Sequence, residues 1–100
     1  MFVHLVLIKL KPGVTRADPR VAAWTAKFAA LENVCAGIVR FEHGWNVTDR
    51  PIAYDYGINI AFATQADLQA YGPHPAHQEV GVVLREIADW VICDFAGASA

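Results

Sequence analysis

The sequence predicts one α+β domain with the element order β-α-β-β-α-β, which is the ferredoxin-like arrangement of a four-stranded antiparallel sheet. Three observations predict it: short β-branched runs, apolar stripes at helical spacing between them, and proline or glycine at the junctions. A chain of 100 residues is long enough for one domain. We expect that domain over residues 1–96 and a flexible tail over residues 97–100.

The first element is a strand over residues 2–10. This β-branched and aliphatic run is too short for a typical helix, and Lys11-Pro12-Gly13 ends it. Both of its alternating faces are largely apolar, so both faces should be covered.

The second element is a helix that begins with Asp18 as N-cap and Pro19 at the first helical position. Its apolar residues recur at spacings of three and four, which places them on one stripe of about four turns. The members of this stripe are Val21, Trp24, Phe28 and Leu31.

Two further strands are predicted over residues 37–46 and 54–62, because aromatic and β-branched residues alternate along both. The polar segment 46–51 between them carries Asp49 and Pro51 and is typical of a turn.

The last three elements are two helices and a strand. Thr64 and Asp67 resemble a capping box at the start of a short helix, which Gly72-Pro73 ends. His74-Pro75 begins the next helix, and residues 90–95 form the final strand. The apolar stripe of the helix that begins at His74-Pro75 contains Val80, Val83, Leu84 and Ile87.

Composition indicates a partner and excludes several function classes. The chain is 55% hydrophobic and only 18% charged, above the usual apolar share of a soluble domain. We therefore expect a homodimer through the open face of the sheet, which would close a barrel and cover the strand edges.

A net charge of −2 argues against nucleic acid as a partner. No apolar run is long enough for a membrane span. Two isolated cysteines and an N-terminus without a cationic region predict a cytoplasmic protein.

His77 and Asp94 are the first candidates for chemistry. His77 shares a helical face with Val80 and Gly81, so its ring should point toward the sheet. Asp94 interrupts an apolar strand, and a carboxylate on the covered face needs a partner. His77 is the obvious partner, and such a pair makes a plausible general base. The alternatives remain that His77 is a hydrogen-bonded core residue and that Asp94 faces solvent.

His4 and Tyr71 are the second pair of candidates. His4 is the one polar residue on its face of the first strand, and the Tyr71 hydroxyl is placed to donate to a carbonyl or enolate oxygen. For either residue, ordinary packing is the more common explanation. The spacing of His74 and His77 is only a weak signal for a metal, since a catalytic zinc site wants three protein ligands. Pro75 favours His74 as a helix cap, and we expect no metal and no cofactor.

The chain resembles the stress-responsive A/B-barrel (Dabb) family over nearly its whole length. The resemblance is carried by residues 3–14, by Glu42-His43-Gly44-Trp45-Asn46, by Tyr54-Asp55-Tyr56-Gly57, and above all by residues 71–77 followed by Gly81. It implies a ferredoxin-like protomer and a homodimeric α+β barrel.

The resemblance also implies a site. One branch of that family is a plant polyketide cyclase, and its catalytic positions match Tyr71, His77 and Asp94, with a pocket-lining histidine matching His4. The expected substrate-binding residues are His4, Val6, Ile8, His74 and Gly81. Gly72-Pro73 departs from the bulkier apolar residues of the cyclase, and so does the segment 78–80. The expected function is a cofactor-independent cyclase or lyase that acts on a small apolar carbonyl compound with His77 as general base. The alternative is a non-catalytic ligand-binding or stress-response protein that uses the same pocket.

Overall fold

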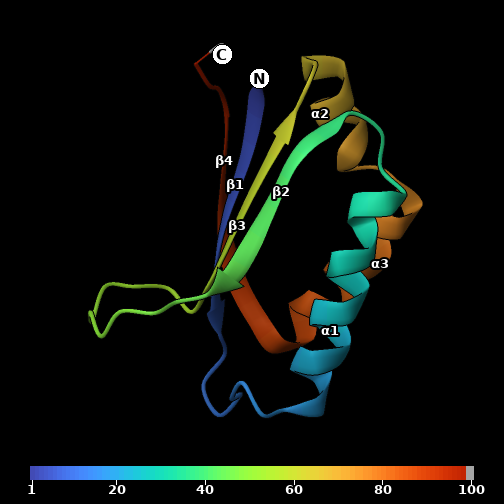
Figure 1. Ribbon diagram of the computed structural model, residues 1–100. Helices are drawn as coiled ribbons and strands as arrows, with labels where there is room; N and C mark the ends of the chain where they lie inside the picture. Colours follow the sequence, from blue (N-terminus) through green and yellow to red (C-terminus); the bar gives the residue numbers. More distant parts are fainter. Residues whose placement is uncertain (99–100) are drawn as a thin grey trace.

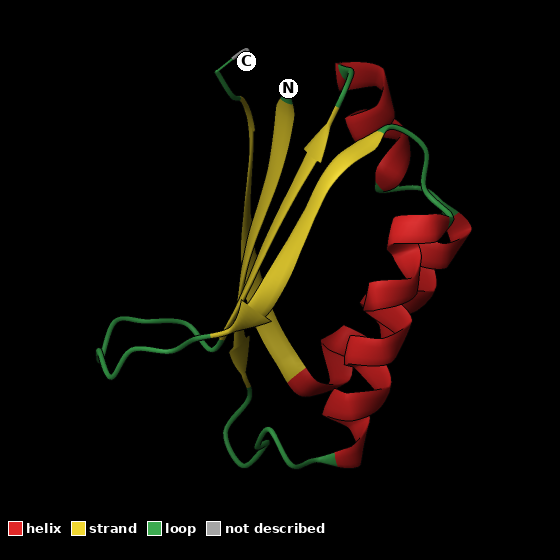
Figure 2. Cartoon of the chain, viewed as in Figure 1, coloured by secondary structure: helices red, strands yellow, loops and turns green. Residues whose placement is uncertain are grey.

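The four strands form one antiparallel sheet with all the helices on a single face. The computed structural model describes residues 1–98, and it has the predicted β-α-β-β-α-β order, with the second helical segment divided in two as the sequence predicts. The helices cover one side of the sheet, and the other side is bare (Figure 1, Figure 2). The predicted ferredoxin-like α+β class is confirmed.

The sheet has the strand order β2-β3-β1-β4, so β2 and β4 are its edges. The two central strands pair in antiparallel register from Phe2 opposite Phe62 to Ile8 opposite Tyr56. On the other side of β1, His4 lies directly opposite Asp94. The strands are β1 (Phe2–Leu10), β2 (Ile38–Trp45), β3 (Tyr56–Phe62) and β4 (Ala88–Ala96).

The helices begin at the caps that the sequence predicts. Asp18 accepts a hydrogen bond from the Arg20 amide, and Thr64 accepts one from the Asp67 amide. A helix that starts this way satisfies an amide that would otherwise lack a partner. The helices are α1 (Pro19–Ala29), which continues as a 3₁₀ turn (Ala30–Asn33), α2 (Gln65–Tyr71) and α3 (Pro75–Ile87).

The core lies between the sheet and the helix layer. Ile60 and Phe62 of β3 are fully buried, and they pack in one core with Phe28 of α1 and Leu31 of the 3₁₀ turn. Burial of each such side chain contributes about 1.5–3 kcal/mol. The core therefore holds α1 and α3 against the sheet, and these two helices form the wall opposite the strands.

Two strands begin two residues away from their predicted start. The last strand begins at Ala88, directly after α3, because Ala88 is already extended while its amide still donates to Leu84. The third strand begins at Tyr56 rather than Tyr54, since the Asp55 side chain caps the Leu10 amide at 2.7 Å. The predicted tail over 97–100 stays a prediction: the Gly97 amide donates to the Met1 carbonyl, and residues 99–100 lie outside the described part.

No helix within residues 1–98 combines the length and the apolar character that a membrane crossing requires.

Candidate functional site

A cavity of about 440 Å³ lies between the sheet and the helices. Its size is that of a small-molecule site, for which 300–1,000 Å³ is usual. The apolar lining includes residues of β1, β3, α1 and α3: Val6, Trp24, Phe28, Ile58, Val80 and Leu84. The polar lining comes from the strands β1 and β4 and from the α2–α3 region: His4, Gln65, Gln69, Tyr71, His77 and Asp94.

The junction between α2 and α3 positions both Tyr71 and His77. Tyr71 is the last residue of α2, and His74 caps α3 by accepting a hydrogen bond from the Ala76 amide at 3.1 Å. Pro75 then occupies the first helical position, where no amide is needed. His77 follows on the inner face of the first turn, so its ring reaches the cavity.

The His77 ring is held by a backbone carbonyl. Its Nδ1 lies 2.9 Å from the Gly72 carbonyl oxygen, which accepts the Nδ1 proton. The neutral ring therefore carries its lone pair on Nε2, and within residues 1–98 no hydrogen bond involves that atom. Burial lowers the pKa of His77, and the nearby His4 and His74 rings lower it further. A neutral imidazole with a free Nε2 is the form that accepts a proton.

Tyr71 packs beside both histidines. Its ring centroid is 4.4 Å from that of His77 and 5.4 Å from that of His4. Burial raises the pKa of the Tyr71 phenol, so the hydroxyl keeps its proton and acts as a donor. No protein hydrogen bond involves this hydroxyl in the described part of the chain, although Tyr71 is only 4% exposed. The hydroxyl is therefore available to a ligand in the cavity.

Asp94 pairs with His4 and not with His77, so the expected pairing is wrong. The Asp94 carboxylate oxygen is 2.5 Å from Nδ1 of His4, because the β1–β4 register sets the two residues side by side. The sequence left open whether Asp94 lies on the covered face or faces solvent, and in the structure Asp94 lines the cavity. The carboxylate fixes the proton on Nδ1 of His4 and turns Nε2 toward other partners. Asp94 is 42% exposed in its side chain, so it stands at the mouth.

The predicted substrate-binding residues divide into two groups. His4, Val6 and Gly81 line the cavity. Ile8 does not, because it lies further along β1, buried against the core. His74 does not either, because its ring is engaged in the cap of α3. For the last two, the structure corrects the expectation.

Sequence reasoning missed the Gly72 carbonyl, Gln65 and Gln69. Carbonyls at a helix C-terminus lack an intrahelical partner, and Gly72-Pro73 marks such an end, so this signal was available. The two glutamines lie on a helix of seven residues, which is too short for a clear polar stripe. Trp24 and Trp90 also form walls of the cavity.

No cluster of three or more His, Cys, Asp or Glu side chains suited to a metal is found among residues 1–98. The site as it stands offers two imidazoles, one phenol and one carboxylate on an apolar cavity. Such groups remove, hold and return protons.

Comparison with known proteins finds relatives by sequence and by structure. An uncharacterised protein of Streptomyces coelicolor is 46% identical over 95 residues, which cover 95% of this chain and 98% of that protein. A dimeric ferredoxin-like protein of unknown function from Jannaschia sp. CCS1 superposes with a TM-score of 0.78, at 26% identity over 96% of this chain and 98% of that one.

A hydroxynitrile lyase from Passiflora edulis has the same fold. It superposes with a TM-score of 0.82, at 14% identity over 99% of this chain and 94% of that one. The family described as Stress responsive A/B Barrel Domain matches residues 2–96. With that match and the Streptomyces relative, the chain belongs to the Dabb family.

Proposed function

We propose that this protein is a cofactor-independent enzyme of the lyase or cyclase type, which removes a proton next to the carbonyl of a small apolar compound. The observation that carries the proposal is the hydrogen bond from His77 Nδ1 to the Gly72 carbonyl, at 2.9 Å. It leaves Nε2 as the basic atom, and the lowered pKa keeps that atom unprotonated near neutral pH.

Tyr71 supplies the second function that the reaction needs. Removal of a proton next to a carbonyl builds negative charge on the carbonyl oxygen, and a donor fixed in an apolar site stabilises that charge. The Tyr71 hydroxyl keeps its proton and has no bond to the protein within residues 1–98, so it is free to donate to this oxygen. After that step His77 holds the abstracted proton on Nε2 and can return it to the product, while His4, held by Asp94, lies against the same phenol ring and positions it.

The cavity defines the substrate class only by shape and polarity. The two histidines, Tyr71 and Asp94 lie together, Gln65 and Gln69 add two amides, and most of the remaining lining is aromatic and aliphatic. The ligand should therefore have a carbonyl head and an apolar body. The hydroxynitrile lyase from Passiflora edulis supports the proposal in one respect: the same fold accommodates a lyase.

The test is exchange of carbon-bound protons in D₂O. We expect the protein to accelerate exchange of the protons next to the carbonyl of 2-nonanone, followed by NMR. His77→Ala should reduce that rate at least tenfold, because it removes the base. His74→Asn is the matched control, since asparagine retains the helix cap and His74 lies outside the cavity. Unchanged exchange in His77→Ala contradicts the mechanism, and binding of 2-nonanone without exchange favours a ligand-binding protein.

The protein should work as a homodimer that joins the open faces of two sheets. Leu7, Val91 and Phe95 project from that face and are each more than a third exposed in the single chain. The Jannaschia protein of this fold is described as dimeric. Sedimentation of the protein at micromolar concentration tests this. A monomer with full proton-exchange activity would show that the reaction does not require the dimer.

A further inference from the structure

The loop between β2 and β3 carries two very exposed apolar side chains. Val47 is 94% exposed and Ile52 is 78% exposed, more than any other large hydrophobic side chain described. Figure 1 shows this loop leaving the end of the sheet on the side away from the helices. That side is the bare face, so the loop extends past the surface on which a second copy would lie. We call residues 46–55 the arm.

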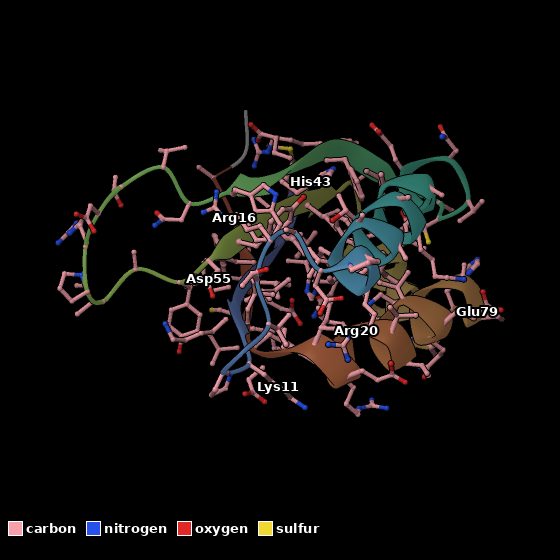
Figure 3. The ribbon with its side chains drawn as sticks, turned by 90° about the horizontal axis from the view of Figure 1, so that it is seen from below. Lys11, Arg16, Arg20, His43, Asp55 and Glu79 are labelled. Carbon is pink, nitrogen blue, oxygen red and sulfur yellow. The ribbon has the colours of Figure 1, made fainter. Side chains whose placement is uncertain are left out.

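The arm is ordered by its own hydrogen bonds. The Asn46 side chain bonds both the Thr48 carbonyl and the Thr48 amide, and the Ala53 amide donates to the Arg50 carbonyl. At its base, Asp55 receives the Leu10 amide and donates its own amide to Ile8, which ties the arm to β1 (Figure 3). A segment held in this way loses little conformational entropy when it binds.

A groove lies at the same end of the sheet as the arm. Its volume is about 480 Å³, and apolar side chains from β1, β4 and the adjoining loops form its walls. Two charges of opposite sign complete the lining. The members are Leu10, Pro12, Tyr54, Trp90 and Val91, with Lys9 and Asp89.

We propose that the arm of one protomer docks in this groove of a second copy of the chain. The inference rests on the homodimer proposed above. Because arm and groove lie at the same end of the sheet, a two-fold axis parallel to the strands brings each arm to its partner's groove. Tyr54, at the base of the arm, lines one wall of the arm's own groove, and the Asp55 bonds hold that base to β1, so the part of the arm with Val47 and Ile52 extends away from the sheet (Figure 1).

The charges of the two surfaces are complementary. The arm carries Asp49 and Arg50, and the groove carries Lys9 and Asp89. None of the ion pairs formed within residues 1–98 includes any of these four side chains. Docking would give Asp49 the partner's Lys9 and give Arg50 the partner's Asp89, which would set the register of the two subunits.

Docking also reaches the candidate active site, because Trp90 forms part of both linings. The partner's arm would therefore support the wall of the cavity and link affinity for the cavity ligand to dimer formation.

The test compares two variants by sedimentation over a dilution series. The double variant Val47→Asp with Ile52→Asp should raise the dimer dissociation constant at least tenfold. Val82→Asp is the control, because Val82 is 57% exposed on α3, on the helix side of the sheet. It should leave the constant unchanged. An arm variant that dimerises like the parent protein overturns the proposal.

Charge reversal tests the same contact without apolar changes. Asp49→Lys and Lys9→Asp should each weaken the dimer, and the double variant should recover it. Additive losses would overturn the pairing. In the arm variant, affinity for 2-nonanone should fall at concentrations where the dimer dissociates. A dimer that persists without the arm removes this inference alone, whereas a monomeric parent protein removes the proposed dimer as well.

Discussion

Asp94 and His4 face each other across β4 and β1, with the Asp94 carboxylate oxygen 2.5 Å from Nδ1 of His4. The pair joins an edge strand to a central strand at the mouth of the cavity. It leaves His77 to a backbone carbonyl, so the two imidazoles of the site are oriented by different kinds of acceptor. His4 therefore lies beside the Asp94 carboxylate, and His77 lies beside the dipole of the Gly72 carbonyl.

Asp94→Asn should impair the orientation of the His4 ring with little change in the stability of the protein. The amide still accepts or donates one hydrogen bond, but it no longer selects the Nδ1-protonated form of His4, so proton exchange should fall about tenfold or more. Stability should change by less than about 1 kcal/mol, since the Asp94 side chain is 42% exposed. The ¹⁵N chemical shifts of His4 report the tautomer directly. Glu86→Gln, which removes an exposed carboxylate from α3, is the control. An unchanged His4 tautomer in Asp94→Asn would contradict this role.

His77 should make stability depend on pH. Above pH 6.5, the ordinary pKa of the group, the ring is neutral in the folded and unfolded states. Below pH 6.5 the unfolded chain takes up a proton at His77 while the folded ring, whose pKa is lowered, does not. The free energy of unfolding therefore falls as pH drops from 6.5 to the folded pKa, and this contribution is constant below it.

Urea unfolding at pH 7.5 and pH 5.5 measures that contribution. His77→Gln should lose less stability between the two pH values than the parent protein, and His74→Asn, which removes one of the groups that lower the His77 pKa, should show a smaller reduction of that loss. Equal losses in the parent and in His77→Gln would show that the folded ring titrates normally. An NMR titration of the His77 ring protons should have its midpoint below 6.5.

Tyr71 and Tyr56 form a matched pair for testing which hydroxyl serves a ligand. Tyr71→Phe removes a hydroxyl without a protein partner within residues 1–98, so stability should change by no more than about 0.5 kcal/mol. The rate of proton exchange should fall about 10²- to 10³-fold, the effect of losing one oxyanion donor.

Tyr56→Phe should give the reverse result. The Tyr56 hydroxyl is hydrogen-bonded to Nδ1 of His43 and lies outside the cavity lining. Its removal should cost about 0.5–1.5 kcal/mol of stability and leave exchange nearly unchanged. Thermal unfolding and the exchange rate, measured on both variants, decide the assignment. Loss of activity in both variants would mean that packing, not the Tyr71 hydroxyl, limits the reaction.

The element order could be predicted from the sequence because its signals are local. The caps at Asp18 and Thr64, the proline at position 75 and the alternation along β3 act over a few residues each. The position of His77 on the inner face of α3 followed from helical spacing for the same reason.

The pairing of Asp94 could not be predicted, because it depends on strand register. Alternation gives the face of a side chain, but only the pairing of β1 with β4 sets His4 opposite Asp94. Gly72-Pro73 does mark a helix end with unpartnered carbonyls, but the sequence does not show which side chain reaches the Gly72 carbonyl. The groove was missed because it gathers residues from separate parts of the chain, among them Pro12 and Trp90.

Gly37 and Gly13 allow a test of how firmly α2 is held against the segment that contains Gly37. Both have positive φ, +80° and +84°, where a non-glycine residue is strained by about 1–2 kcal/mol. A Cβ on Gly37 would lie 2.2 Å from the Asp67 carboxylate and 2.6 Å from its Cβ, whereas a Cβ on Gly13 would meet nothing within 4 Å. Asp67 cannot move freely, because it bonds the Thr64 hydroxyl that caps α2. Gly13→Ala should therefore cost about 1 kcal/mol and Gly37→Ala about 3 kcal/mol or more, measured by urea unfolding. Equal losses would mean that α2 shifts to admit the methyl group, and Tyr71, at the end of that helix, should then show altered ring shifts.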